Sequence, residues 1–232
     1  MYADAIAKIV GSVFPIFVVR QGDDSPAMGV VGTGFFVDDD GLFVTVDHFM
    51  FPKLPDATHY YYGQIPDHVC QPAVEIECVA RDPARDLYLG RVNRNYLRPV
   101  ELATEPVRPG NSVCLSGYPM AVVAASAGGG FVGNVRRYWQ PSFVIDATQA
   151  VIDNRTYDGY IVQHACLPGM SGGPVFDMKG KIRGMAVANL TRTIPEPSGN
   201  PIVVSNGIVI DIDHIRGFVK AFGRATDGSM GH

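Results

Sequence analysis

The chain has 232 residues, 47% of them hydrophobic and 18% charged, which is enough apolar material for the core of one large domain or two small ones. With 19 Lys and Arg against 23 Asp and Glu, the formal net charge is −4, and no basic stripe marks a surface for nucleic acid. The 26 glycines and 17 prolines are spread along the chain, which favours an all-β protein with many tight turns.

The N-terminal residues 1–19 predict neither a leader peptide nor a membrane span. They lack a basic start, Lys8 interrupts the apolar run, and no small-residue cleavage site follows. We therefore expect a cytoplasmic protein that does not associate with membranes.

The first part of the chain alternates apolar, β-rich runs with turns. Asp40-Gly41 separates two of these runs, and a glycine there accepts the positive φ of a tight hairpin. A Tyr-rich segment with His59 and His68 has no clear periodicity and is expected to be an irregular loop. Strands are expected at residues 13–20, 30–37, 42–46, 73–80 and 87–92.

After residue 100 the pattern restarts, beyond a Pro-rich connection at residues 98–111. Residues 211–222 place apolar side chains on one helix face, with Asp211 or Asp213 as the cap, and predict a C-terminal helix. Strand signals at this spacing favour a barrel or a sandwich. The strands of this part are expected at residues 112–117, 143–146, 160–166, 174–177, 182–188 and 202–210.

The four cysteines show no metal-site spacing, and no cofactor motif is present. Cys114 and Cys166 each lie in an apolar, strand-like run, which predicts buried and reduced thiols. Cys70 and Cys78 could form a disulfide across a hairpin or stay reduced.

The strongest local signal is the heptad Pro168–Pro174, in which glycines flank Ser171. A serine on such a turn can expose its hydroxyl, and its own N–H can point with that of Gly169 at one spot. Two converging amides are what a tetrahedral oxyanion requires. The heptad therefore predicts a catalytic nucleophile, with an ordinary glycine-rich β-turn as the alternative.

A serine hydroxyl is a poor nucleophile without a neighbouring base. Among the six histidines we select His48, because the end of a predicted strand can aim its side chain into a cleft. His164 is close to Ser171 in sequence, but the alternation of its strand turns it elsewhere. A strand-end histidine bound to a backbone carbonyl is the alternative for His48. The other histidines are His59, His68, His214 and His232.

The third group of such a site must hold the imidazole in one tautomer and stabilise its charged form. Asp86 opens an apolar strand, where a carboxylate can be partly buried beneath a histidine. It could instead be a turn residue or a partner of Arg85. Asp82 precedes a proline and is the better turn former.

Four blocks of the sequence, in this order, resemble the chymotrypsin-fold serine proteases, above all the HtrA-like (DegP-like) bacterial group. They are Gly32–Val37, Phe43–His48, Asp82–Leu89 and Gly169–Pro174. The resemblance covers about residues 13–190 and implies an all-β fold of two six-stranded antiparallel β-barrels with a C-terminal helix. Residues 1–100 would form the barrel with His48 and Asp86, residues 101–210 the barrel with Ser171, and residues 211–232 the helix and a tail.

The resemblance also implies a serine endopeptidase that cleaves peptide or protein substrates through an acyl-enzyme, without a cofactor or metal. Its roles carry over to His48 as base, Asp86 as orienting acid and Ser171 as nucleophile. The N–H groups of Gly169 and Ser171 would be the oxyanion donors. The first specificity pocket would be lined by Ala165, Cys166, Val187, Ala188 and Asn189, which predicts small to medium apolar P1 side chains.

Three features depart from the family pattern. Asp47 replaces a small residue before the histidine, Met170 replaces Asn or Asp before the serine, and no PDZ-like segment follows the second barrel. Lys8–Gly11 looks like the activation site of trypsin zymogens, but Met170 leaves a freed amino terminus without an acceptor. We therefore interpret Lys8–Gly11 as core-packing sequence.

Two other functions stay open on these departures. The chain could be a protease-like fold that binds peptides without cleaving them. It could also be a latent effector that waits for a regulatory partner protein, with loops at residues 120–135 and 150–160 as the switch.

Overall fold

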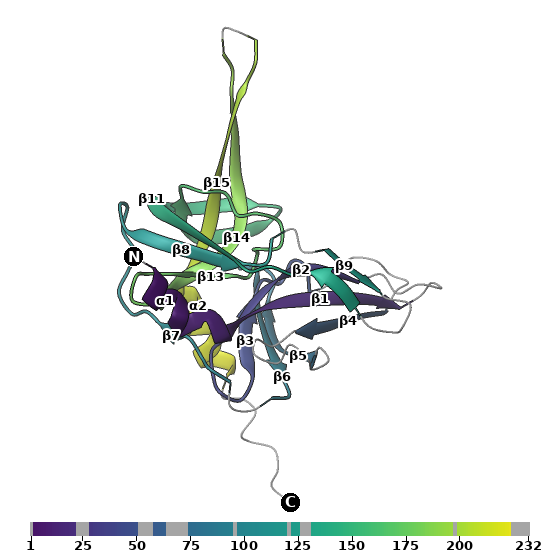
Figure 1. Ribbon diagram of the computed structural model, residues 1–232. Coiled ribbons are helices and arrows are strands. Elements are labelled where there is room, and N and C mark those ends of the chain that lie inside the picture. The colour runs from purple at the N-terminus through teal and green to yellow at the C-terminus, as the bar shows by residue number, and fades with distance from the viewer. Residues whose placement is uncertain are drawn as a thin grey trace, which may run out of the picture.

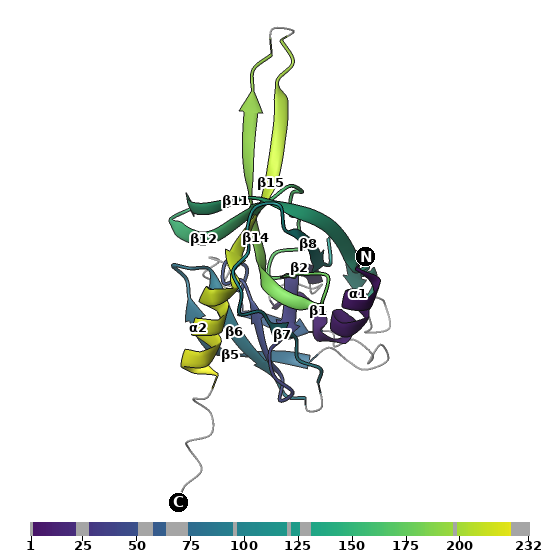
Figure 2. The same ribbon diagram turned by 90° about the vertical axis from the view of Figure 1, so that its left-hand side faces the viewer.

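The computed structural model describes residues 2–21, 28–50, 58–63, 74–94, 97–119, 122–125, 131–196 and 199–223. In these residues the chain forms two β-barrels that lie against each other, with helices at their flank (Figures 1 and 2). Both barrels are antiparallel, as expected for this all-β chain.

The first barrel is closed by six strands in the order β1-β2-β3-β6-β5-β4. Aromatic rings fill it: the ring centroids of Phe14 and Phe36 lie 4.5 Å apart, and those of Phe14 and Phe43 lie 5.1 Å apart. Gly41, at φ +92°, makes the predicted turn between β2 and β3. The strands are β1 (Val13–Gln21), β2 (Met28–Phe36), β3 (Leu42–Thr45), β4 (Thr58–Gly63), β5 (Val74–Asp82) and β6 (Leu87–Val92).

The second barrel is a sheet in the order β13-β8-β11-β12-β15-β14, and a further pairing of β13 with β14 closes the ring. A short strand, β7 (Glu101–Leu102), adds to β14 in parallel. The strands of the ring are β8 (Ser112–Gly117), β11 (Tyr138–Ile152), β12 (Arg155–Val162), β13 (Pro174–Phe176), β14 (Lys181–Ile194) and β15 (Ile202–Asp211). The expected pair of six-stranded barrels is therefore confirmed. The boundaries of domains at residues 100 and 210 stay a prediction.

In the described residues a hairpin, two α-helices and a 3₁₀ turn surround the barrels. A hairpin of β9 (Val122–Ala125) and β10 (Phe131–Asn134) lies beside β2. The N-terminus forms α1 (Ala3–Ile9) and the 3₁₀ turn η1 (Val10–Ser12). The predicted C-terminal helix is α2 (Ile212–Phe222), and the Asp211 carboxylate caps it by accepting the Asp213 N–H at 2.9 Å.

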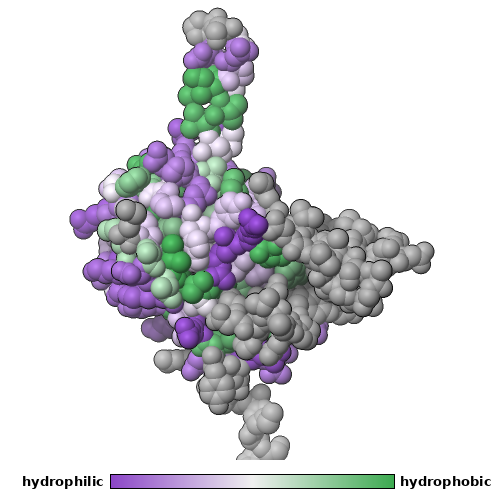
Figure 3. All heavy atoms as spheres, in the orientation of Figure 1, coloured by the Kyte–Doolittle hydropathy of each residue, from purple (hydrophilic) through white to green (hydrophobic). Residues whose placement is uncertain are grey.

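The outer halves of β14 and β15 leave the second barrel as a two-stranded arm (Figure 1). Its exposed apolar side chains form the green patch on the arm in Figure 3. They are Ile194, Ile202, Val203 and Val204.

Several sequence predictions were wrong in detail. The Tyr-rich loop contains β4, and residues 150–160 form the ends of β11 and β12 instead of a loop. The strand expected at residues 160–166 ends at Val162, where the chain bends toward Ser171. Most of β11 is exposed, so the apolar alternation that would have predicted its full length is absent. Most of residues 120–135, the other expected switch, lies outside the described residues or has no described side chains.

Candidate active site

His48 lies three residues beyond the end of β3, at the edge of the first barrel. The hydroxyl of Thr45, the last residue of β3, donates to the carbonyl of Thr33 at 2.7 Å and ties β3 to β2. The His48 side chain is 32% exposed, so one side of the ring is open to solvent. The predicted position at a strand end is confirmed.

Asp86 holds His48 at two points. One carboxylate oxygen, Oδ1, accepts the backbone N–H of His48 at 2.8 Å, and Oδ2 lies 2.8 Å from ring Nδ1. Asp86 is fully buried and has a φ of +57°, which is uncommon for a residue with a side chain. This contact directs the Nδ1–H tautomer, with Nε2 as the basic nitrogen. Asp82 forms the preceding turn, as predicted, by accepting the N–H of Arg85.

Ser171 lies on the tight turn that precedes β13. The N–H groups of Met170, Gly172 and Gly173 donate to the carbonyls of Leu167, Ala186 and Met170. Within the described residues, the N–H groups of Gly169 and Ser171 have no protein acceptor. A φ of +94° at Gly169 and of +81° at Gly172 makes this turn possible. The turn therefore offers two unpaired amides on either side of Met170.

Contacts between the barrels bring Ser171 to the edge that carries His48. The Thr33 N–H donates to the Ser171 carbonyl at 2.9 Å, and the Thr33 hydroxyl donates to the Gly169 carbonyl at 2.8 Å. A Cβ added to Gly32 would lie 2.9 Å from the Ser171 carbonyl oxygen and 2.1 Å from the ring of Phe49. The Phe49 ring meets the His48 ring edge to face at 5.4 Å.

The Ser171 hydroxyl itself donates to the carbonyl of Val187 at 3.3 Å. Among the described residues no hydrogen bond joins this hydroxyl to His48. Val187 lies at a register shift in the pairing of β14 with β15, between Ala186 and Ala188. Sequence reasoning missed this contact, because a bulge in one strand leaves no periodic signal.

The predicted pocket residues lie on two segments that flank the serine. The side-chain amide of Asn189 joins them: its Oδ1 accepts the Cys166 N–H at 2.7 Å, and its Nδ2 donates to the Cys166 carbonyl at 2.8 Å. Cys166 and Val187 are buried, and Ala165 and Ala188 are half-buried. Whether these residues bind a P1 side chain stays a prediction.

The two unusual neighbours of the site have structural contacts. Asp47 is buried and pairs with the guanidinium of Arg81. Met170 is fully buried in the second barrel, and its Cα lies 2.7 Å from a Cβ added to Gly117. In the zymogen-like motif Ile9 is buried, whereas Lys8 and Val10 are exposed, so the expected packing role holds for Ile9 and not for the whole motif.

The other candidate histidines do not reach the serine turn in the described residues. His164 contacts the hydroxyl of Ser142 at 3.1 Å, and His214 pairs with Asp158 at 3.2 Å. The backbone of His59 lies on β4. His68 and His232 lie outside the described residues.

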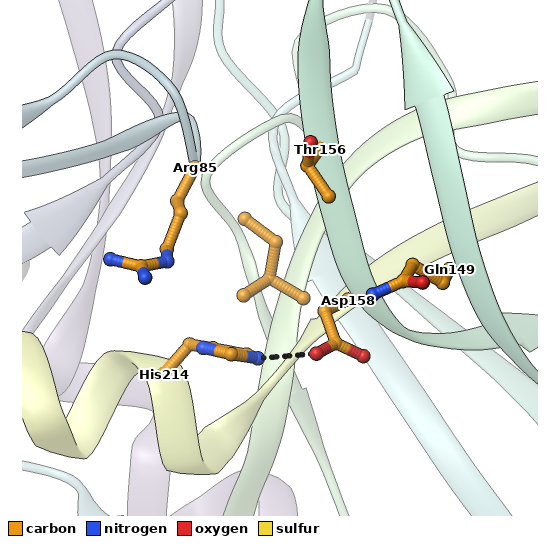
Figure 4. A pocket seen from close by; sticks show the side chains of 6 residues that line it. Arg85, Gln149, Thr156, Asp158 and His214 are labelled. Carbon is orange, nitrogen blue, oxygen red and sulfur yellow. Dashed lines mark ion pairs between the residues drawn. The ribbon is translucent and has the colours of Figure 1, made fainter.

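A cavity of about 200 Å³ lies between Arg85, the β11–β12 hairpin and α2 (Figure 4). His214 and Asp158 line this cavity and form an ion pair with each other. No group of three His, Cys, Asp or Glu in the described residues could hold a metal ion. Nor does any helix there have the length and hydropathy to cross a membrane.

The cysteines follow the prediction in part. Cys114 and Cys166 are free and buried, and Cys78 is free and exposed. The proposed disulfide partner, Cys70, lies outside the described residues.

The chain is similar in sequence to bacterial proteins, among them a probable serine endoprotease. A probable periplasmic serine endoprotease of the DegP-like type from Pseudomonas putida is 27% identical over 214 residues, which cover 91% of this chain and 39% of that protein. The uncharacterized protein y4bJ of Sinorhizobium fredii is 32% identical over 165 residues, covering 71% of this chain and 23% of that protein. The chain thus spans less than half of these curated relatives. The relative from Pseudomonas putida is named as a periplasmic protein, so it gives no support to the cytoplasmic location expected for this chain.

Solved structures show the same fold. The Rv3671c protease of M. tuberculosis in its active form matches with a TM-score of 0.63 and 21% identity, over 94% of this chain and 84% of that chain. The HtrA-type protease AlgW, solved as a variant with a tripeptide, also matches with a TM-score of 0.63, at 18% identity, over 95% of this chain and 63% of that chain.

A family model described as a trypsin-like peptidase domain matches residues 32–185, which include His48 and Asp86 and the whole serine turn. This is more than half of the chain. The match agrees with the barrel fold and with the resemblance to HtrA-like proteases. The chain therefore belongs to the family of trypsin-like peptidase domains.

Proposed function

We propose that the chain is a serine endopeptidase that works through Ser171, His48 and Asp86. The turn around Ser171 carries this proposal, because it leaves the N–H groups of Gly169 and Ser171 unpaired within the described residues, and two such donors could bind one negative oxygen. The loss of one such donor costs about 3–4 kcal/mol of transition-state stabilisation.

The proposed reaction uses these groups in turn. The Ser171 hydroxyl turns from Val187 toward His48, gives its proton to Nε2 and attacks the peptide carbonyl. The N–H groups of Gly169 and Ser171 hold the oxyanion of the tetrahedral intermediate. His48 then protonates the leaving amine, and water hydrolyses the acyl-enzyme by the same two steps. Asp86 holds the ring and stabilises its charged form throughout.

A fluorophosphonate probe tests the nucleophile directly. We expect wild type to be labelled, His48→Gln to be labelled slowly and Ser171→Ala not at all. Ser205→Ala is the matched control, because its hydroxyl contacts that of Thr191 on the arm and its loss should leave labelling intact. Circular dichroism establishes that each variant is folded. A folded wild-type protein that resists the probe would contradict the proposal.

A latent effector is the second candidate, and the contact of Ser171 with Val187 favours it, because it holds the hydroxyl away from the base. Latency predicts slow labelling that accelerates when a peptide ligand or a regulatory partner protein is added. Labelling at the same rate with and without them supports the constitutive enzyme.

We also propose that the pocket beside Ser171 takes small to medium apolar P1 side chains, since it has no acidic residue among Ala165, Cys166, Val187, Ala188 and Asn189. Dominant cleavage of a peptide library after Arg, Lys or Glu would contradict this preference. The cytoplasmic location stays a prediction, and fractionation of cells that express the tagged protein tests it.

A further inference from the structure

The tip of the β11–β12 hairpin, from the second barrel, lies against the loop of the first barrel that carries Asp86. Asp153 and Asn154 form the turn with φ of +51° and +62°. The N–H of Thr156 donates to the carbonyl of Ala84 at 3.0 Å and joins hairpin and loop. Sequence reasoning missed this contact, although Asp-Asn between two strands is a hairpin signal.

At this tip the two faces of β12 contact different parts of the molecule. Arg155 and Tyr157 contact Asp86. Thr156 and Asp158, which alternate with them, line the cavity next to His214, as Figure 4 shows. The strand thus provides its own control positions: a change at Thr156 disturbs the same hairpin without touching Asp86.

The carboxylate of Asp86 has two partners from each barrel. The first barrel supplies the backbone N–H and the ring Nδ1 of His48, both at 2.8 Å. The second barrel supplies the Tyr157 hydroxyl, which donates to Oδ2 at 3.1 Å, and Arg155 Nε, which lies 3.6 Å from Oδ1. Burial, and then the neighbouring Asp86, raise the pKa of the Tyr157 hydroxyl, so it stays protonated and remains a donor.

We propose that Tyr157 and Arg155 are positioning residues. They determine how tightly Asp86 holds the ring of His48 and how strongly it stabilises the protonated, charged form of that ring. Oδ2 divides its hydrogen-bonding capacity between Tyr157 and His48, and the Arg155 cation offsets part of the Asp86 charge. The inference rests on the proposed function, because it concerns the same three catalytic groups. It adds that side chains of the second barrel determine how strongly Asp86, a residue of the first barrel, acts on His48.

The other charged groups around this site are paired or lie on its margin. Asp47 is paired with Arg81 of β5, and Asp82 with Arg85 in the loop before β6. Asp153 lies in the turn of the hairpin itself. Loss of the Arg155 charge leaves Asp86 more negative toward His48, so the charged form of the histidine is favoured. Loss of the Tyr157 hydroxyl acts in the same direction, because among the described residues His48 is then the one donor left to Oδ2.

The experiment compares Tyr157→Phe, Arg155→Met and the charge-preserving Arg155→Lys with wild type in the full chain. The first readout is the titration of the His48 imidazole by NMR, assigned with a His48→Gln variant, which needs no peptidase activity. The second is the pH dependence of kcat and KM. Thr156→Val is the matched control.

We expect the His48 titration and the acid limb of kcat/KM to move up by about one pH unit in Tyr157→Phe and in Arg155→Met. We expect kcat to fall about tenfold with little change in KM. Arg155→Lys keeps the charge, so its titration should stay close to that of wild type, and Thr156→Val should show no shift. Titrations that coincide with wild type in both variants overturn the inference, as does a loss of kcat that Thr156→Val matches. If wild type has no peptidase activity, the proposed function fails, and the NMR titration still decides the coupling.

Discussion

Asp47, the residue before the candidate base, gives both of its carboxylate oxygens to the guanidinium of Arg81. Nε lies 2.6 Å from Oδ1 and Nη2 lies 3.0 Å from Oδ2. The carboxylate is almost fully buried, whereas the Arg81 side chain is 33% exposed. The hydrogen bond that the Arg81 guanidinium donates to Asp47 raises the pKa of Arg81 and keeps it charged. The pair therefore joins the His48 loop to β5, and Asp47 has its own partner beside the proposed catalytic groups.

Asp47→Asn should destabilise the fold by about 1–2 kcal/mol, because the amide lacks the charge that matches the guanidinium. Addition of Arg81→Met should recover part of this loss, since the double variant leaves no guanidinium without its carboxylate partner. Urea unfolding of the two single variants and the double variant measures the coupling. Strictly additive losses would contradict the pairing as a source of stability.

Gly172 lies where the serine turn meets the first barrel. A Cβ at this position would lie 2.1 Å from Thr45 Oγ1 and 2.2 Å from the Thr33 carbonyl oxygen, at a φ of +81°. We expect Gly172→Ala to separate turn and barrel and to lower labelling of Ser171 at least about tenfold. Gly110→Ala has a similar φ of +87° with no atom within 4 Å, so it controls for backbone strain alone. Equal labelling of the two variants would refute the steric argument.

The sequence predicted the parts of this fold that depend on local patterns. The strands that bury a face, such as β6 and β8, were predicted within a residue or two, because their apolar runs are continuous. His48 and Asp86 were selected because each lies at the end of such a strand, and the structure places them in contact. The family match covers residues 32–185 and so includes both residues, while their catalytic roles stay a prediction.

The parts that were missed depend on contacts between distant segments. β11 exposes most of its residues, so its length follows from pairing with β8 and β12 and not from its own pattern. Tyr157 and Arg155 were not candidates, because nothing near them in the sequence indicates that their strand ends against Asp86. The contact of Ser171 with Val187 likewise joins residues on different segments.

The three described cysteines should differ sharply in reactivity. Burial raises the pKa of Cys166 to about 12 and that of Cys114 to about 12, so both stay neutral thiols near physiological pH. Only a thiolate is nucleophilic, and Cys78 is exposed. We expect iodoacetamide to label Cys78 in the native protein and to reach Cys114 and Cys166 only above about pH 10 or after unfolding. Peptide mass mapping measures this, and fast native labelling of Cys166 would contradict its burial.

Asn189 offers the sharpest test of specificity, since its side chain bridges the two segments that flank Ser171. Both hydrogen bonds go to the backbone of Cys166, at 2.7 and 2.8 Å, so the amide takes up space between Cys166 and β14. Asn189 is exposed, so if these segments are the walls of the P1 pocket, its amide limits the room between them on the solvent side.

Asn189→Ala should therefore raise kcat/KM for Leu or Phe at P1 relative to Ala by about tenfold, as the removed amide makes room for added methylenes. Asn206→Ala is the matched control, because that amide donates to the Gln163 carbonyl elsewhere on the same sheet. Peptides that differ only at P1 measure the ratio for both variants. An unchanged ratio in Asn189→Ala would show that the Asn189 amide does not limit the P1 pocket.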